Sequence, residues 1–167
     1  MQVKPFNNFK LVSRGYIIGA MDKYDELIEK IEGLLAAEKP LEALELSEEA
    51  IKVNEKENLK QPEGWFYKGL ALYRLDKKEE AIVAFDKAIN INPELSEAWY
   101  NKGIVLNDFG KEKEAIVAFD MSISLLEKKS GDFEHLASAW YSKGYSLIVL
   151  KENYEEVYCS PLRTSNC

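Results

Sequence analysis

Cysteine and histidine are scarce in this chain of 167 residues. Both cysteines, Cys159 and Cys167, lie in the last nine residues, so they cannot form a disulfide framework around a small core. A single histidine, His135, supplies too few imidazoles for a histidine-rich metal site, and we interpret it as a surface or helix-end residue. We therefore expect no metal site and no cofactor.

Clustered positive charge and long apolar runs are also missing. There are 22 Lys and Arg against 29 Asp and Glu, a net charge of −7, with the acidic residues spread along the chain. A nucleic-acid surface needs grouped Lys and Arg to neutralise phosphates, and a membrane helix needs about 20 consecutive apolar residues. We expect neither nucleic acid nor membrane as a partner. The composition favours a soluble, cytoplasmic protein, or one with a basic partner.

Catalytic motifs are absent as well. The sequence has no Gly-rich phosphate loop, no CxxC pair and no His–Glu metal motif. Its acidic residues often have a lysine four positions later, as in Glu48 and Lys52, a spacing typical of solvated helix faces. We therefore predict that this chain is not an enzyme.

The first 21 residues differ from the rest because they contain Lys4, Lys10 and Arg14 and no acidic residue. Their best apolar run, residues 16–21, is interrupted by Gly19 and is shorter than the core of about 7–15 residues in a secretory signal. The helical pattern begins at Asp22. We therefore predict that residues 1–21 are a weakly structured N-terminal extension.

The clearest feature that is present is an internal repeat. The segment WFYKGLALYRLDKKEEAIVAFDKAININP, from Trp65, matches WYNKGIVLNDFGKEKEAIVAFDMSISLLE, from Trp99, at an offset of 34 residues. A third copy, WYSKGYSLIVLKENYEE, starts at Trp140, at an offset of 41. We expect the additional residues to lengthen the preceding helix before a turn at Gly131, with Phe133 packing back onto the stack.

Each copy predicts two helices. Trp65, Gly69 and Leu72 recur at i, i+4 and i+7, the spacing of one helix face, and a second stretch repeats this spacing from Ala81. Proline cannot continue a helix, so Pro93 marks the end of the second stretch. Each repeat therefore reads as a helix, a short turn, a second helix and a stop.

Glycine recurs in the middle of each first helix, at Gly69, Gly103 and Gly144. A mid-helix glycine costs roughly 1 kcal/mol relative to alanine, and a fold tolerates that cost where another helix approaches closely. We expect Ala81 and Ala115 of the second helices to face these glycines. We interpret the tryptophans and phenylalanines that recur in these copies mainly as residues that pack in the core.

These residues resemble the tetratricopeptide repeat (TPR), a 34-residue unit of two helices. The copy from Trp65 matches nearly throughout, and the next departs at Ser122 and Glu127. The resemblance implies an all-α solenoid of antiparallel helix pairs, a TPR superhelix, with about three and a half repeats. We place the TPR domain at residues 22–155, with repeats at 24–57, 62–95, 96–129 and, in part, 137–155, followed by a tail at 156–167.

The same resemblance implies a concave groove lined by the first helix of each pair. Helical phase predicts that residues beside each tryptophan point into it, and they are unusually apolar and aromatic. The predicted groove residues are Glu63, Phe66, Leu70, Tyr73, Glu97, Tyr100, Ile104, Asn107, Asp108, Tyr141, Tyr145 and Ile148.

Rigid aromatic side chains often supply most of the energy of an interface, and exposed apolar patches mark partner sites. We therefore predict a protein–protein interaction module that binds a peptide or helix of a partner. The acidic residues Glu63, Glu97 and Asp108 favour a basic or amphipathic ligand. Three alternatives stay open: a groove filled by the chain itself, a TPR fragment of a larger regulatory protein, and a self-associating module that forms a homo-oligomer through the incomplete last repeat, which leaves Leu147, Ile148 and Leu150 uncovered.

One TPR subclass grips the C-terminal carboxylate of heat-shock chaperones with Lys, Asn and Arg in the groove. Asn101 occupies one of the corresponding places here, whereas Phe66, Leu70, Ser138 and Ser142 occupy others. Because the basic residues are missing, we predict that this groove is not a carboxylate clamp.

Overall fold

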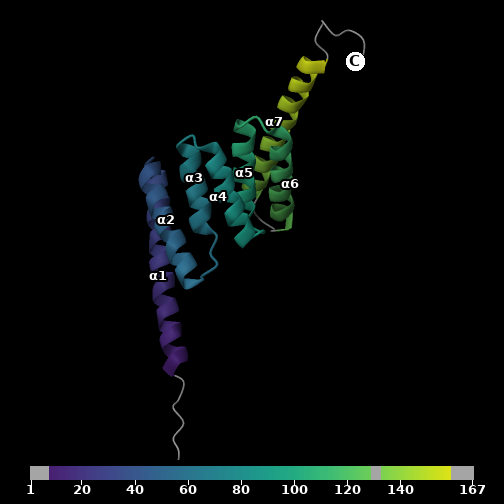
Figure 1. Ribbon diagram of the computed structural model, residues 1–167. Helices are drawn as coiled ribbons and strands as arrows, with labels where there is room; N and C mark the ends of the chain where they lie inside the picture. Colours follow the sequence, from purple (N-terminus) through teal and green to yellow (C-terminus); the bar gives the residue numbers. More distant parts are fainter. Residues whose placement is uncertain (1–7, 129–132, 159–167) are drawn as a thin grey trace, which may run out of the picture.

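The protein is a row of helices. The computed structural model describes the backbone of residues 8–128 and 133–158, and the side chains of residues 19–128 and 133–151. Within these ranges the chain forms seven helices and no strand, following one another in sequence across the molecule (Figure 1). The helices are α1 (Asn8–Ala36), α2 (Pro40–Glu57), α3 (Glu63–Arg74), α4 (Lys78–Ile91), α5 (Ser96–Asp108), α6 (Glu112–Lys128) and α7 (Phe133–Tyr158).

The helices are arranged in two layers. Each helix contacts the next along the chain, and α1 contacts α3, α3 contacts α5, and α5 contacts α7. In the described parts of the chain, α2 does not contact α4, and α4 does not contact α6. Elements lie closest together on the inside of a curved stack. The odd-numbered helices therefore form the inner, concave layer, and the even-numbered helices form the outer layer.

Proline, asparagine and glycine set several helix ends. Pro40 opens α2 at the first helical position, where its missing N–H costs nothing. Asn58 ends the same helix with a φ of 52°, in the left-handed region that asparagine tolerates. Gly110 follows α5 with a φ of 73°, and Pro93 follows α4. The stop at Pro93 is where the sequence predicts it.

A glycine packs directly against a phenylalanine ring in two helix pairs, α3–α4 and α5–α6. A Cβ built on Gly69 would lie 2.7 Å from a ring carbon of Phe85, and one on Gly103 would lie 2.6 Å from Phe119. Both rings are fully buried. The predicted close approach is confirmed, but the predicted partner is wrong. The atoms nearest to each glycine belong to these rings rather than to Ala81 and Ala115, because the longer ring reaches across the helix interface.

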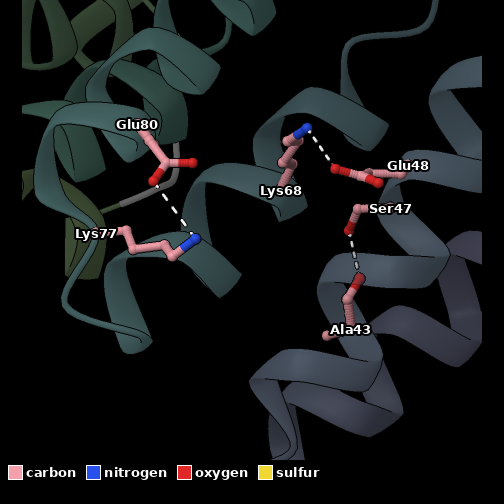
Figure 2. Close-up of polar contacts among 6 residues, drawn as sticks. All are labelled: Ala43, Ser47, Glu48, Lys68, Lys77 and Glu80. Atoms are coloured by element: carbon pink, nitrogen blue, oxygen red, sulfur yellow. Dashed lines mark hydrogen bonds and ion pairs between the residues drawn. The ribbon is translucent and has the colours of Figure 1, made fainter.

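A lysine three residues after each tryptophan joins consecutive helix pairs. Its ammonium group lies over the indole ring, and it pairs with an acidic residue on the preceding outer helix. The ammonium groups of Lys68, Lys102 and Lys143 lie 5.5, 5.6 and 5.0 Å from the ring centroids of Trp65, Trp99 and Trp140. The ion pairs are Lys68–Glu48 at 2.9 Å (Figure 2), Lys102–Asp86 at 2.6 Å and Lys143–Asp120 at 2.5 Å.

The insertion before the last copy is partly as predicted. Helix α6 has 17 residues against 14 in α4, so the lengthened helix is confirmed. The turn at Gly131 lies outside the described residues. Phe133 does not pack back: it begins α7 and is 77% exposed, because Leu136 is the residue of the first turn that packs against Ile123 and Leu126.

The two ends of the predicted domain fall inside helices. Residues 8–21 belong to α1, residues 156–158 belong to α7, and residues 1–7 and 159–167 lie outside the described residues. The domain limits at 22 and 155 stay predictions. Because α7 runs on as one helix to Tyr158, no second helix of the last repeat follows it within the described residues.

Candidate functional site

The inner layer exposes a line of aromatic side chains next to the tryptophans. Phe66 on α3 packs on Phe85, with ring centroids 6.0 Å apart, and Tyr100 on α5 packs on Phe119 at 5.8 Å. Each ring thus rests on the phenylalanine that locks its own helix pair. Phe66 and Tyr100 are half-buried, so one side of each ring is supported and the other is accessible.

A cavity of about 260 Å³ opens between α3, α5, α6 and the start of α7. It is lined by Phe66, Ser96, Glu97, Tyr100, Asn101, Ser122, Leu126 and His135. Small-molecule and cofactor sites usually occupy roughly 300–1,000 Å³. This smaller cavity is better matched to one side chain of a larger ligand.

The polar groups around the cavity hold its wall in place. The Asn101 side-chain amide donates a hydrogen bond to the Glu97 carbonyl at 2.8 Å, and the Ser122 hydroxyl donates to the Ser96 carbonyl at 3.0 Å. The Glu97 carboxylate, half-buried, accepts a hydrogen bond from the Ser96 hydroxyl at 3.1 Å. No lysine or arginine is among the lining side chains that the structure describes. The cavity wall therefore carries the Glu97 carboxylate and the His135 imidazole, with no lysine or arginine among its described side chains.

At the other end of the inner layer, three predicted groove residues bind to the protein itself. The Tyr73 hydroxyl donates a hydrogen bond to the Asp108 carboxylate, which joins α3 to α5. The Ser146 hydroxyl donates to the Asn107 side-chain oxygen at 3.0 Å, which joins α5 to α7. These contacts fix the spacing of the inner helices.

Burial, together with the Asp108 carboxylate, raises the pKa of the Tyr73 hydroxyl to about 12. Replacing Asp108 with asparagine removes the negative charge and keeps an oxygen acceptor. We expect the pKa of Tyr73 to fall but to stay above its ordinary value, since burial is the larger cause. Site-resolved ¹³C NMR of the tyrosine ring during a pH titration measures this. A Glu114→Gln variant is the matched control, and an unchanged Tyr73 pKa in the Asp108 variant would contradict the contact.

The structure brings together only part of the predicted groove set. Phe66, Glu97 and Tyr100 share the cavity. The half-buried Leu70 and Ile104 pack against the core clusters between the helices. Glu63, at the start of α3, lies 3.5 Å from the Tyr24 hydroxyl.

The predicted residues on α7 are the most exposed of the set. Tyr141, Tyr145 and Ile148 are 78%, 54% and 57% exposed, and none of them lines the cavity. The hydroxyl of Tyr100 lies 3.4 Å from that of Ser142. The α7 tyrosines therefore begin one residue from the point where α7 meets α5, close to the rim of the cavity.

The sequence prediction placed the groove on the first helix of each pair only, and it missed the cavity residues that lie on a second helix. Ser122 and Leu126 belong to α6, the second helix of its pair. The departure from the repeat at Ser122 was the available signal, because a hydroxyl replaces a methyl group at a buried position. His135 is exposed in the first turn of α7, as its surface interpretation predicts, and it also lines the cavity.

Within the part of the chain that the structure describes, no three His, Cys, Asp or Glu side chains gather in an arrangement that could hold a metal ion. None of the helices in that part of the chain combines the length and the apolar character needed to cross a membrane.

Comparison with known proteins gives the same repeat and the same fold. Two family models described as tetratricopeptide repeat match residues 62–95 and 84–117. No curated protein shows a significant match. Solved structures with similar folds include the Sgt2 TPR domain of Aspergillus fumigatus, with 16% identity over 87% of each chain and a TM-score of 0.68.

Two further similar structures were solved as complexes. The TPR2B domain of yeast Sti1, in a pHsp70 complex, is 18% identical over 74% of this chain and 97% of its own, with a TM-score of 0.63. The second TPR of Spaghetti (RPAP3), bound to the HSP90 peptide SRMEEVD, is 20% identical over 64% of this chain and 97% of its own, with a TM-score of 0.58. With the matched repeats and the layered helix pairs, these similarities show that the chain is a tetratricopeptide-repeat protein.

Proposed function

We propose that this protein is a binding module that holds a peptide or helix of a partner protein against its inner layer. The observation that carries the proposal is the cavity between α3, α5, α6 and α7, with the Phe66 and Tyr100 rings in its wall. The exposed tyrosines of α7 extend this aromatic surface. A partner segment that places one side chain in the cavity would lie along α5 and α7.

The charge of the site favours a basic or amphipathic segment. Glu97 lines the cavity, and Glu63 and Asp108 lie on the same layer. A lysine or arginine of a ligand would meet a half-buried carboxylate at Glu97, where attraction is stronger than in open water. Apolar side chains of the same segment would cover the rings of Tyr100 and Tyr141.

The complexes of similar proteins support the mode of binding and not the ligand. The Spaghetti domain is bound to SRMEEVD, an acidic peptide. In this chain Asn101 occupies one place of the carboxylate-gripping subclass and Phe66, Leu70, Ser138 and Ser142 occupy the others, so the basic side chains of that subclass are missing. We therefore propose a ligand of the opposite charge.

Selection from a peptide display library tests this function. Enriched peptides are expected to have a net positive charge and an apolar side chain for the cavity, and to compete with one another for one site. SRMEEVD, made synthetically, is expected not to bind in fluorescence polarisation. Enrichment no better than on an unrelated helical protein would overturn the binding function. Binding of SRMEEVD would overturn the proposed ligand chemistry.

A second candidate function is self-association. The exposed Leu147 and Ile148 on α7 favour it, because contiguous exposed apolar side chains mark interfaces. Light scattering over a range of concentrations separates the two, since a monomer at every concentration excludes a structural oligomer. A place within a larger regulatory protein and a cytoplasmic location stay predictions.

A further inference from the structure

Helix α7 has the sequence of a first helix, but within the described residues no second helix follows it and packs on it. Trp140, Gly144 and Leu147 repeat the spacing of Trp65, Gly69 and Leu72. In the two complete repeats, this face is covered by α4 or α6. On α7 we call these three residues the open face.

The side of α7 next to the open face is docked as in the other repeats. Ala139 and Ser146 are fully buried, and Lys143 pairs with Asp120 on α6. The orientation of α7 is therefore that of α3 and α5. Its open face must point where a following outer helix would lie.

Exposure along the series shows what is missing. Leu72 and Leu106 are each 2% exposed, whereas the equivalent Leu147 is 47% exposed. A Cβ on Gly69 or Gly103 would strike a phenylalanine ring, whereas one on Gly144 would find no atom within 4 Å among the described residues. Next to Gly144 there is therefore open space at the position where Phe85 and Phe119 lie in the two complete repeats.

The end of a repeat stack is normally closed by a polar surface. Here Trp140 is 49% exposed beside Leu147. An apolar face of this composition is typical of an interaction surface and not of a cap.

We propose that the open face of α7 docks a partner helix with the pattern of α4 and α6, namely a phenylalanine four residues after an alanine, with a small residue three positions later. In α4 these are Ala81, Phe85 and Ala88, and in α6 they are Ala115, Phe119 and Ser122. The partner phenylalanine seats on Gly144 and its alanine lies against α7. The docked helix continues the series of interfaces already present twice in this molecule.

The partner helix lies outside residues 1–167, and as part of this proposal we place it in a different protein. A second copy of this chain has no free helix of this kind, because the Ala and Phe side chains of α4 and α6 are buried in their own repeats. Residues 159–167 contain neither alanine nor phenylalanine, so they do not provide the pattern either. This docking site is separate from the inner layer on which the proposed function depends.

The probe for the test is a peptide of residues 111–128, which contains α6. A hydrocarbon staple that replaces Val117 and Met121, both exposed in α6, keeps it helical without touching the docking face. We expect saturable 1:1 binding by calorimetry, with a shift of the indole N–H resonance of Trp140. The Phe119→Ala peptide is expected to bind at least about tenfold more weakly, because the ring supplies most of the buried area.

A Gly144→Ala variant of the protein provides the decisive comparison in this test. Without a docked helix the new Cβ meets nothing, and alanine favours the helix, so Tm is expected to rise by about 2–4 °C. With the helix docked, the Cβ would press on the ring, so affinity for the peptide is expected to fall at least about tenfold. Misfolding cannot produce both changes together.

Three results would overturn the proposal: no binding of the stapled peptide at millimolar concentration, equal binding of the Phe119→Ala peptide, or shifts at Trp99 instead of Trp140. The last would mean that the peptide displaces α6 from its own repeat. Peptides selected on the inner layer are expected to bind Gly144→Ala as they bind the original protein. A failure of helix docking on the open face can therefore be distinguished from a failure of peptide binding on the inner layer.

Discussion

Replacing Phe119 with alanine is expected to lower the free energy of unfolding by about 3–5 kcal/mol. The ring is fully buried, rests directly on Gly103 and supports Tyr100 on its other side. Its removal leaves a cavity that the surrounding helices cannot close, because α5 and α6 are held by their other contacts. Since domains of this size are stable by about 5–15 kcal/mol, this one change removes a large share of the total. Urea denaturation followed by circular dichroism measures the loss.

The test becomes specific when Gly103 is changed as well. In the original protein, Gly103→Ala places a Cβ 2.6 Å from the ring, an overpacking expected to cost about 1–3 kcal/mol. In the Phe119→Ala background the same Cβ enters empty space, and alanine gains roughly 1 kcal/mol of helix propensity. The two changes are therefore expected to couple strongly, with a change of sign. An equal cost of Gly103→Ala in both backgrounds would show that glycine and ring do not form one unit.

The second large effect concerns binding. For a peptide selected on the inner layer, the double change Tyr100→Ala and Tyr141→Ala is expected to weaken binding about 100-fold or more, because central aromatic side chains commonly cost 2 kcal/mol or more each. Tyr141 is 78% exposed, so its removal should not affect folding. Fluorescence polarisation with the labelled peptide measures affinity, and circular dichroism measures helicity.

Two controls accompany this variant. Val83→Ala with Val117→Ala removes two exposed apolar side chains of the outer helices, which are 57% and 62% exposed, and is expected to leave affinity unchanged. Tyr100→Phe keeps the ring on Phe119 and removes only the hydroxyl, so it shows whether packing or hydrogen bonding matters. Unchanged affinity in the double tyrosine variant would exclude the inner layer as the site.

The sequence could predict those parts of the structure that depend only on residues within one repeat. Helix ends follow from Pro40, Gly110 and Pro93, whose backbone preferences act locally. The repeat spacing gives the order of the helices, and it correctly indicates a close approach at Gly103. Each of these signals depends on residues within a few turns of one another.

Contacts between repeats were beyond the sequence because they depend on how far neighbouring helices are rotated against each other. Periodicity places Tyr73 and Asp108 on the same layer, but it cannot show that they bind each other. The same holds for the cavity, which combines Phe66 of one repeat with Leu126 of the next and His135 in the first turn of α7. The partner of each glycine was also misjudged, since spacing gives the face of a helix and not the reach of its side chains.

The two-layer arrangement also has a mechanical consequence. Inner helices touch their inner neighbours, whereas outer helices of successive repeats do not touch one another. Bending that spreads the outer layer therefore separates no outer helix from a direct outer neighbour, while bending that spreads the inner layer must separate Tyr73 from Asp108 and Ser146 from Asn107. The stack can therefore change its curvature to close around a bound segment. The hydrogen bonds of the Tyr73 and Ser146 hydroxyls hold the inner helices at a fixed spacing while it does so.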